Sequence, residues 1–433
     1  MSERNANRPG YKKTREGWIP EEWEVRSLFE LCSIRGEYGA SKASSAFSEQ
    51  LPRYIRITDI TAEGYLDPEE KCSVDLDDEE FKKYELKKND TLFARSGATV
   101  GKTYTHTNEQ KNLAFAGYLI RFRPDPEKLD SRFLHHFTHS SRYWYWVKST
   151  SHAGAQPNIN ATEYGSLPIP VPSISEQEEI SEILGIWDQA IEQTQQLIDA
   201  KQRLKKGLMQ QLLTGRMRFP GFGPPVDKVG ELPEGWEEKR IEDIGSLYNG
   251  LTGKTKLDFG KGKPFIPYTN IMNNSAIDPN NFGYVKITSS EKQNRVKYGD
   301  ALFTASSETA KEISMSSVVL TDVDECYLNS FCFGLRFKDL DNLLPEYARY
   351  LFRSSKLRKS LLPLAQGFTR YNISKTSFLK IKLTLPKNEE QNKIAAILEI
   401  TESDINNLQK KINYYHKVKK GLLQVLLSGE VRV

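Results

Sequence analysis

The chain has 433 residues, a length at which two or more separate cores are the first expectation. Hydrophobic residues make up 38% of the chain and charged residues 27%, which is typical of a globular protein rather than a disordered one. The formal net charge of +4 permits nucleic-acid binding without demanding it, because a strongly basic footprint would be more diagnostic.

Cysteine usage and the N-terminus exclude several protein classes. The four cysteines, Cys32, Cys72, Cys326 and Cys332, form no Cys-x-x-Cys pair, which argues against a structural zinc site and against a disulfide scaffold. The N-terminal segment MSERNANRPGYKKTREG is polar and lacks the apolar core of a signal peptide. No apolar run approaches the roughly 20 residues of a membrane helix. We therefore expect a soluble, cytoplasmic protein.

An internal repeat organises the chain. Gly215 follows Leu-Leu-Thr and Gly429 follows Leu-Leu-Ser, an offset of about 214 residues, or half the chain. Five further pairs of segments match in the same order: PEEWE at 20–24 and PEGWE at 233–237, YIRITDI at 54–60 and FIPYTNI at 265–271, DTLF at 90–93 and DALF at 300–303, NIN at 158–160 and NIS at 372–374, and the Glu-Gln pairs at 176–177 and 390–391. This order indicates a tandem duplication rather than a solenoid of short repeats.

Each half divides into a β-rich part and a helical part. Short β-type runs such as YIRITDI, DTLFARS, GYLIRFRP and SLPIPVP are bounded by Gly, Pro and Asn. A proline-free stretch then runs to Gly215 or Gly429, with Ser175 or Asn388 placed as an N-cap. We expect an α/β (α+β) protein with modules at 1–174 and 220–387 and helical segments at 175–219 and 388–433.

The helical segments carry a stripe of mostly apolar residues that recur largely in steps of four and three. The stripe comprises Ile180, Leu184, Trp187, Ile191, Ile198, Leu204, Leu208 and Leu212 in the first copy, and Ile394, Leu398, Thr401, Ile405, Leu408, Ile412, Val418, Leu422 and Leu426 in the second. This heptad-like spacing is interrupted near residues 194–201 of the first copy, and two helices with matching stripes are expected to pair as a coiled coil. A helix of ~39 residues would be nearly 60 Å long and would separate the two modules. Ordinary core helices are the alternative, but these average only about 11–12 residues.

Several of these motifs resemble those of one known family. The segment PIPVPSISEQEEISEIL, its repeat LTLPKNEEQNKIAAIL, the openings GWIPEEW and ELPEGW, and the stretches KKNDTLFARSGATVGK and GAQPNIN are similar to those of type I restriction–modification specificity subunits. The resemblance extends over essentially the whole chain. The second module departs from the pattern, because YGDALFTASSETAKE lacks the Gly-x-x-x-Gly-Lys element. That departure leaves the geometry of this loop open.

The resemblance implies a non-catalytic, DNA-addressing subunit. Each module would be a target-recognition domain for one half of an interrupted double-stranded DNA site, and the two helices would pack antiparallel in a pseudo-twofold, circular organisation. Two modification (methyltransferase) subunits and two restriction (translocase-nuclease) subunits would join it. The chain itself would hold no cofactor, with S-adenosylmethionine, ATP and Mg²⁺ on those partners. Two similar readers on a rigid spacer favour half-sites about one helical turn, or about 34 Å, apart.

DNA readout needs polar and basic side chains on loops, where they reach base edges and phosphates. The candidates in the first module are Arg35, Lys42, Arg95, Ser96, Lys102, His152, Gln156 and Asn158, and those in the second are Thr252, Lys254, Lys256, Ser306, Ser307, Lys311, Arg370 and Asn372. Surface Lys and Arg are usually only solvated, so we expect the loop clusters to matter more than any single member.

Two local patterns invite other functions. The loop at 97–103 suggests a nucleotide-binding P-loop, but Ser96 stands where that motif needs glycine. This loop brings Lys102 to a DNA phosphate or is a structural turn. Histidines 135 and 139 have the i, i+4 spacing of metal ligands, yet without an HExxH motif or a cysteine pair we assign no metal. The aromatic cluster at 143–146 is expected to pack in the core or rim of the first module.

Basic residues crowd the later part of each helical segment: Lys201, Arg203, Lys205 and Lys206 in the first, and Lys417, Lys419 and Lys420 in the second. They form a solvated face that favours the helix C-terminus, or they dock partner helices or the DNA backbone.

Motifs of catalysis are missing from the sequence. We find no Asn-Pro-Pro-Tyr-type tetrapeptide, no glycine-rich S-adenosylmethionine element and no Asp…Glu-x-Lys nuclease pattern. This disfavours a free-standing methyltransferase or nuclease. A protein-interaction scaffold is the other alternative, and two divergent loop sets argue against it.

Overall fold

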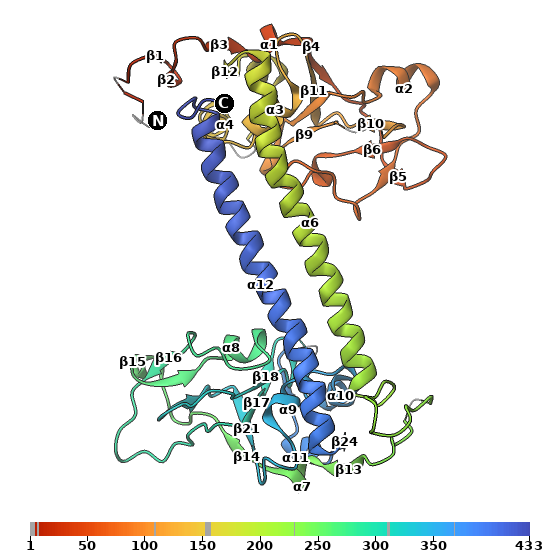
Figure 1. The fold of residues 1–433 in the computed structure, drawn as a ribbon, viewed down its shortest axis with the longest axis vertical. Helices are drawn as coiled ribbons and strands as arrows, with labels where there is room; N and C mark the ends of the chain where they lie inside the picture. Colours follow the sequence, from red (N-terminus) through yellow and green to blue (C-terminus); the bar gives the residue numbers. More distant parts are fainter. Residues whose placement is uncertain are drawn as a thin grey trace. The chain divides into compact units, whose positions relative to one another are not determined.

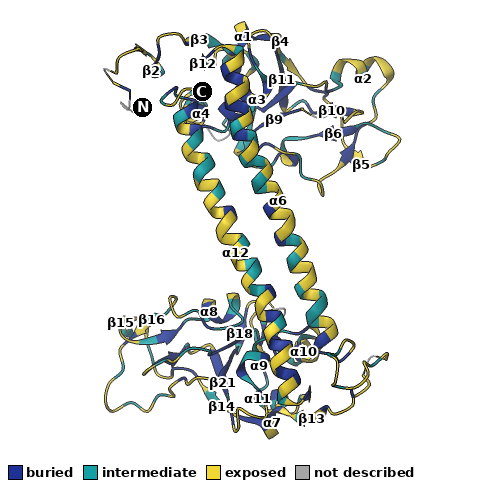
Figure 2. Ribbon diagram, viewed as in Figure 1, coloured by how far each residue is buried: buried dark blue, intermediate teal, exposed yellow. Residues whose placement is uncertain are grey.

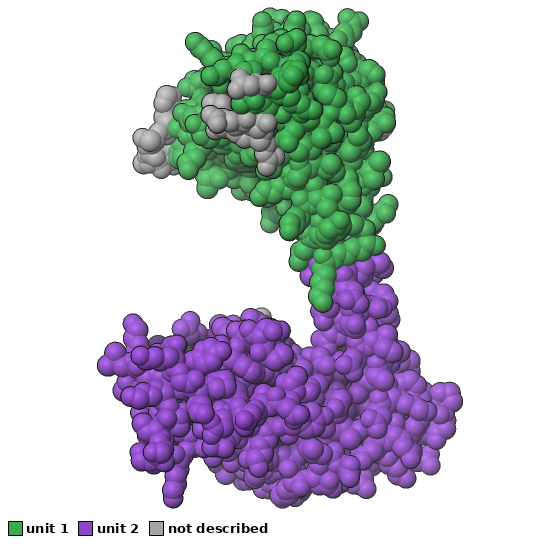
Figure 3. Space-filling model, turned by 60° about the vertical axis from the view of Figure 1, so that its left-hand side comes forward, with its two compact units in different colours: residues 1–195, 410–433 green, residues 196–409 purple. Residues whose placement is uncertain are grey.

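The computed structural model of the chain forms two compact units (Figure 3). The structure describes residues 5–6, 8–107, 110–151, 157–228, 230–309, 312–367 and 369–433. Unit 1 comprises Met1–Gln195 and Lys410–Val433, and unit 2 comprises Gln196–Gln409. Each unit therefore contains one β-rich module and a part of both long helices.

Unit 1 is built around an antiparallel four-stranded sheet of order β4-β11-β8-β9 (Figure 1). A second sheet has the order β10-β6-β7-β5, and β12 pairs with β3 at the start of the long helix α6. The elements are β1 (Tyr11–Thr14), β2 (Gly17–Pro20), β3 (Glu24–Ser27), α1 (Leu28–Leu31), β4 (Cys32–Tyr38), β5 (Ser45–Ala46), β6 (Arg53–Ile55), β7 (Cys72–Ser73), α2 (Asp78–Tyr84), β8 (Thr91–Ala94), β9 (Thr103–Thr105), β10 (Leu113–Phe115), β11 (Leu119–Pro124), α3 (Ser131–Phe137), α4 (Ser141–Thr150), α5 (Ala161–Gly165), β12 (Pro168–Val171) and α6 (Ile174–Leu212).

Unit 2 repeats this plan in the same order. Its four-stranded sheet is β14-β21-β17-β19, joined by the smaller sheets β16-β15-β20, β18-β23-β22 and β13-β24. The elements are β13 (Glu237–Arg240), α7 (Ile241–Ile244), β14 (Gly245–Asn249), β15 (Phe259–Ile266), α8 (Tyr268–Asn273), β16 (Gly283–Val285), β17 (Ala301–Thr304), β18 (Ser306–Ser307), β19 (Ser316–Val318), β20 (Tyr327–Leu328), β21 (Cys332–Phe337), α9 (Pro345–Leu351), α10 (Ser355–Leu361), β22 (Ala365–Gln366), β23 (Tyr371–Ile373), α11 (Lys375–Leu379), β24 (Lys382–Leu385) and α12 (Asn388–Leu426).

The two long helices pack antiparallel in both units. Early residues of one helix contact late residues of the other: Trp187 with Tyr415 and Asp188 with Lys419 in unit 1, and Lys201 with Asp404 and Lys205 with Glu402 in unit 2. Figure 2 shows the buried residues along the sides of the helices that face the modules and each other. Both helices have 39 residues, so the coiled-coil pair predicted from the stripe is present.

Every residue of the predicted stripe except Leu204 is buried or half-buried. Ile180, Leu184, Ile198, Leu212, Ile394, Leu398, Ile412 and Leu426 are buried, and Trp187, Ile191, Leu208, Ile405, Leu408 and Leu422 are half-buried. Leu204 is the exception to the wider stripe, with 50% of its surface exposed. It lies six residues after Ile198, which places it off the face that steps of seven define.

The apolar spacing is interrupted near residues 194–201, but the helix is not. Helix α6 continues through it, because Thr194 and Lys201 take the stripe positions that apolar residues hold elsewhere. Thr194 is buried and its hydroxyl donates to the Ala190 carbonyl at 2.6 Å. The basic residues Lys201, Lys205 and Lys419 likewise form ion pairs with the opposite helix. These three lysines therefore pair within the chain, and their contact with partner helices or with the DNA backbone stays a prediction.

Two local predictions also need correction. Helix α6 begins at Ile174 and is capped by Ser173, whose hydroxyl accepts from the Glu176 amide at 3.3 Å, so Ser175 is not the cap. Asn388 is the first residue of α12 and not its N-cap. The strand expected over YIRITDI ends at Ile55, because a 3₁₀ turn follows in which Asp59 accepts hydrogen bonds from Arg56.

A Trp–Glu–Arg contact closes each unit and explains the repeated PEEW and Glu-Gln motifs. In unit 1 the Trp23 indole donates to Glu176 at 3.2 Å, and Arg432 pairs with the same carboxylate. In unit 2 the Trp236 indole donates to Glu390 at 2.9 Å, and Arg218 pairs with that group. The opening of each module is thus fixed to the start of one long helix and to the segment that follows the end of the other.

The described helices include none that is long and apolar enough to cross a membrane.

Candidate nucleic-acid interface

One corner of unit 1 brings several sequence candidates together. It lies where β8 ends and the segment before α5 returns, with Ser96 and Asn158 in a backbone bridge. The Ile159 amide donates to the Arg95 carbonyl at 2.9 Å, which fixes this return. The Arg95 guanidinium stacks over the Tyr38 ring, 5.0 Å from its centroid, and its Nε is buried without a hydrogen-bond partner in the described chain.

Unit 2 builds the equivalent corner on the same backbone frame. Ser306 of β18 pairs with Asn372 of β23. The Ile373 amide donates to the Ala305 carbonyl at 3.2 Å, which matches the contact between Ile159 and Arg95 in unit 1. The Arg370 guanidinium lies 4.7 Å from the centroid of the Phe331 ring. Both corners therefore present Asn and a stacked Arg, but the arginine follows β8 in unit 1 and precedes β23 in unit 2.

An exposed aromatic residue completes each corner, and the sequence analysis did not identify it. Tyr118 is 61% exposed and its carbonyl accepts from the Arg95 amide at 3.0 Å. Phe331 is 48% exposed and accepts from the Ala305 amide at 2.8 Å in the same way. Both precede the first residue of a sheet strand, β11 or β21. An alignment of the two halves of the sequence at these strands could have identified Tyr118 and Phe331 as equivalent residues.

We refer to Tyr38, Arg95, Ser96, Tyr118 and Asn158 as corner 1. Corner 2 consists of Ser306, Phe331, Arg370 and Asn372. Ser306 itself is buried, so its backbone shapes corner 2 more than its hydroxyl can. Ser307 is also buried and donates to Glu312 at 2.7 Å.

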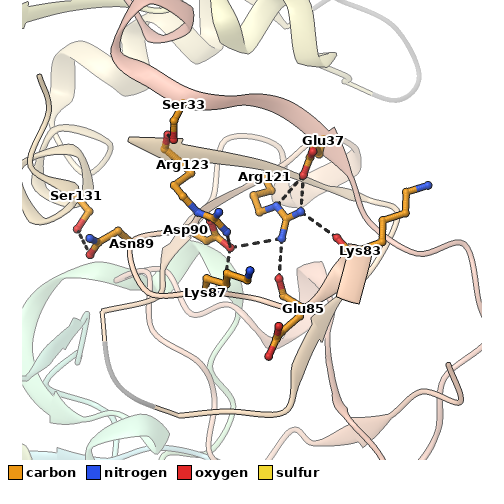
Figure 4. Close-up of polar contacts among 10 residues, drawn as sticks. All are labelled: Ser33, Glu37, Lys83, Glu85, Lys87, Asn89, Asp90, Arg121, Arg123 and Ser131. Atoms are coloured by element: carbon orange, nitrogen blue, oxygen red, sulfur yellow. Dashed lines mark hydrogen bonds and ion pairs between the residues drawn. The ribbon is translucent and has the colours of Figure 1, made fainter. Parts of the chain in front are cut away.

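A buried aspartate orders the strands that carry corner 1 (Figure 4). Asp90, at the start of β8, is fully buried and accepts from Arg123 at 2.7 and 3.0 Å and from the Lys87 amide at 2.8 Å. Arg121 lies between this carboxylate, at 3.5 Å, and Glu37 of β4. The cluster joins β4, β8 and β11, whose ends lie at or beside corner 1.

Asp300 does the same in unit 2. It accepts from Arg336 at 2.6 and 3.0 Å and from the Tyr248 hydroxyl at 2.7 Å. Burial, together with the Asp300 charge, raises the pKa of the Tyr248 hydroxyl, which therefore stays a donor. The repeated Asp-x-Leu-Phe motif is thus a structural clamp behind each corner.

Lys102 has a structural role in the described molecule. Its ammonium donates to the Ile60 carbonyl at 3.0 Å rather than projecting from the loop. Two buried tyrosines fix the backbone of this loop. The Gly101 amide donates to the Tyr164 hydroxyl, and the Gly101 carbonyl accepts from the Tyr143 hydroxyl. Of the two interpretations of this loop, the geometry favours the structural turn.

Most of the other described candidates have partners within their own unit. Lys42 pairs with Glu80 at 2.9 Å, which raises the pKa of the lysine, and Arg35 donates to the Cys32 carbonyl. Lys254 pairs with Glu291, and this contact lowers the pKa of that carboxyl to about 2. Thr252 is held by Gln293, and Lys256 is exposed. His152, Gln156 and Lys311 lie outside the described residues.

Comparison with known proteins adds independent findings. The family model of the type I restriction modification DNA specificity domain matches the chain twice, at residues 20–201 and 233–414. A putative type I restriction enzyme MjaX specificity subunit of Methanocaldococcus jannaschii is 27% identical over 98% of this chain and 97% of its own length. The type I restriction enzyme EcoKI specificity subunit of Escherichia coli is 23% identical over 78% of this chain and 72% of its own.

Solved structures share the fold. The S subunit of a type I restriction-modification system from M. genitalium superposes with a TM-score of 0.56 at 15% identity, covering 96% of this chain and 98% of that one. A chain of a type I R-M system, solved to explain complex assembly and conformational transition, gives a TM-score of 0.53 at 16% identity, covering 95% and 99%.

Proposed function

The chain belongs to the family of type I restriction–modification DNA specificity subunits, and we propose that each of its units reads one half of an interrupted DNA target through its corner. As a specificity subunit, the chain is not itself the catalyst. The observation that carries the proposal is the presence of two equivalent corners, built on one backbone frame from different side chains.

The chemistry of the corners suits base and phosphate contacts. Asn158 and Asn372 carry side-chain amides that can pair with adenine edges, and Arg95 and Arg370 can pair with guanine or with phosphate. Each arginine is stacked on an aromatic ring, which holds the guanidinium in place before DNA arrives. Because Ala305 stands at the position of unit 2 that is equivalent to Arg95, we infer that the two half-sites differ.

The catalytic partners would be two modification subunits and two restriction subunits, acting in the cytoplasm where the DNA lies. They would supply the S-adenosylmethionine, ATP and Mg²⁺ that adenine methylation and restriction require. Support for a pair of modification subunits comes from Ile186 on α6 and Ile400 on α12, which are 65% and 59% exposed. The two stand at equivalent positions of the repeat, as two docking sites for identical subunits would.

The experiment is methylation mapping in a host genome. The chain is expressed with its modification subunits, methylated adenines are sequenced, and the same host lacking only this chain is compared. We expect one interrupted motif to be methylated in the first strain and unmodified in the second. Methylation that persists without the chain would refute the proposal.

A further inference from the structure

Metal-ligating side chains meet in unit 1 where the recognition module packs on the long helix. His135 and His136 come from α3, and Asp188 comes from α6. One ligand atom of each lies within 4.8 Å of the other two. The closest measured approach to the carboxylate is 3.8 Å, from His136 Nδ1 to Asp188 Oδ2.

One nitrogen of the His136 ring faces the Asp188 carboxylate and has no hydrogen-bond partner in the described chain. This nitrogen, Nδ1, is buried. The unpartnered Nδ1 faces a carboxylate oxygen across 3.8 Å, and a metal ion held between the two atoms would be bound by both.

Unit 2 has no histidines at the equivalent positions. At the repeat offset of about 214 residues, the counterparts of His135, His136 and Asp188 are Arg349, Tyr350 and Glu402. Arg349 pairs with Glu402, and the Tyr350 hydroxyl donates to the same carboxylate at 2.9 Å. A lysine of the opposite helix completes both sites, Lys205 on Glu402 and Lys419 on Asp188.

Unit 1 therefore has two imidazole rings at the positions where unit 2 has the hydrogen-bond donors Arg349 and Tyr350. A neutral imidazole nitrogen is the form of histidine that binds metal ions. Lys419 pairs with Oδ1 of Asp188, and the Tyr65 side chain is hydrogen-bonded to the same carboxylate. Oδ2 is the oxygen that faces His136.

We propose that His135, His136 and Asp188 bind a divalent transition-metal ion of the Zn²⁺ type, which ties α3 of the recognition module to α6. Two imidazoles and one carboxylate form a ligand set that such ions accept, with a water in a remaining position. Ligands about 2.0–2.2 Å from zinc in a tetrahedral arrangement stand a little over 3 Å apart, so the observed separation needs only a small side-chain shift. In unit 2 the equivalent contact between the module and the long helix is made by Arg349 and Tyr350, and in unit 1 the ion would strengthen this contact.

Metal binding is measured on the full-length chain without a polyhistidine tag. Zn²⁺ is titrated calorimetrically, and Co²⁺ is used as a spectroscopic probe. We expect one equivalent to bind, with a Co²⁺ spectrum that lacks a thiolate charge-transfer band, because the four cysteines are buried elsewhere. Zn²⁺ is also expected to raise the unfolding temperature.

The variants use the protein's own second copy as a guide. H135R/H136Y introduces the side chains of unit 2, and D188N removes the third ligand with little change of shape. Each should weaken binding by more than the roughly 10- to 100-fold that loss of a supporting residue costs. H416A, at the exposed histidine of α12, is the matched control and should bind as the wild type does. K419Q should bind more tightly, because it frees Asp188 and removes a competing charge.

Wild-type protein that binds no Zn²⁺ would overturn the proposal. So would an affinity that is unchanged in a folded D188N or H135R/H136Y variant, since the ion would then lie elsewhere. Because D188N alone suffices for this comparison, the test stands even if the double variant does not fold.

Discussion

At the scale of single residues, Asn158 and Asn372 should each control one half-site. A well-placed bidentate pair to a base contributes about 1–3 kcal/mol of discrimination, so N158A should lower the affinity for DNA by roughly ten- to a hundredfold. The loss should vanish when the half-site read by corner 1 is already mutated. N372A should behave likewise for the other half-site, so each variant is the control for the other. Binding to a panel of singly mutated targets measures this, and equal losses on every target would contradict it.

The sequence predicted candidate residues well where the two halves of the chain match. It failed for residues whose role depends on whether their side chains are exposed. Ser96 and Asn158 were candidates, and the structure places them in one bridge. Their contact with DNA stays a prediction. Tyr118 and Phe331 were overlooked, because an aromatic residue beside a strand is usually core and only the fold shows that these two are exposed. Lys102 was overvalued, since a lysine in a glycine-rich loop gives no sign of its bond to Ile60.

At the scale of elements, the aspartate clamp should matter more than any surface ion pair. D90A leaves the buried Arg121 and the partly buried Arg123 without their shared carboxylate, so the free energy of unfolding should fall by about 3 kcal/mol. Denaturant unfolding of the full chain measures the loss. E127Q, at an exposed glutamate near the same strand, should change the value by less than about 0.5 kcal/mol. A loss for D90A as small as that of E127Q would show that the clamp does not stabilise the sheet.

The seam between the long helices offers a second comparison. Ile198 is 1% exposed and its neighbour Leu197 is exposed, although both are large aliphatic residues on α6. I198A should cost about 2–4 kcal/mol of unfolding free energy, because it leaves a cavity in the seam. L197A should cost well under about 1 kcal/mol. The same unfolding measurement checks both variants, and equal costs would mean that the helices do not pair through this stripe in solution.

The helix pair also shows what periodicity can and cannot predict. Steps of seven identified the stripe correctly, because a helix face repeats at that interval. Polar residues such as Thr194 and Lys201 also occupy positions of the stripe. A search for apolar residues alone therefore finds a gap there and wrongly includes Leu204, which lies on another face of the helix. The ion pair from Lys201 to Asp404 joins residues about 200 positions apart, which no local pattern contains.

At the scale of the whole molecule, the duplication was the most informative feature of the sequence. One offset predicted two modules, two long helices and their order, and the Trp–Glu–Arg contacts of both units follow it residue by residue. The smaller sheets were beyond prediction, since β5, β7, β18 and β22 have only two residues each and depend on their neighbours. The histidines of α3 carried no distinctive motif until their counterparts in unit 2 were known.

The repeat also makes a prediction about assembly, which rests on the proposed function. If Ile186 and Ile400 are equivalent docking positions, I186E should remove one modification subunit, I400E the other, and the double variant both, because a buried unpaired carboxylate opposes each interface. Native mass spectrometry of the co-expressed complex counts the subunits. L204E is the control, since Leu204 is exposed but its counterpart Val418 is half-buried, so no second copy of that surface exists. A double variant that still holds two modification subunits would place their docking sites elsewhere on the chain.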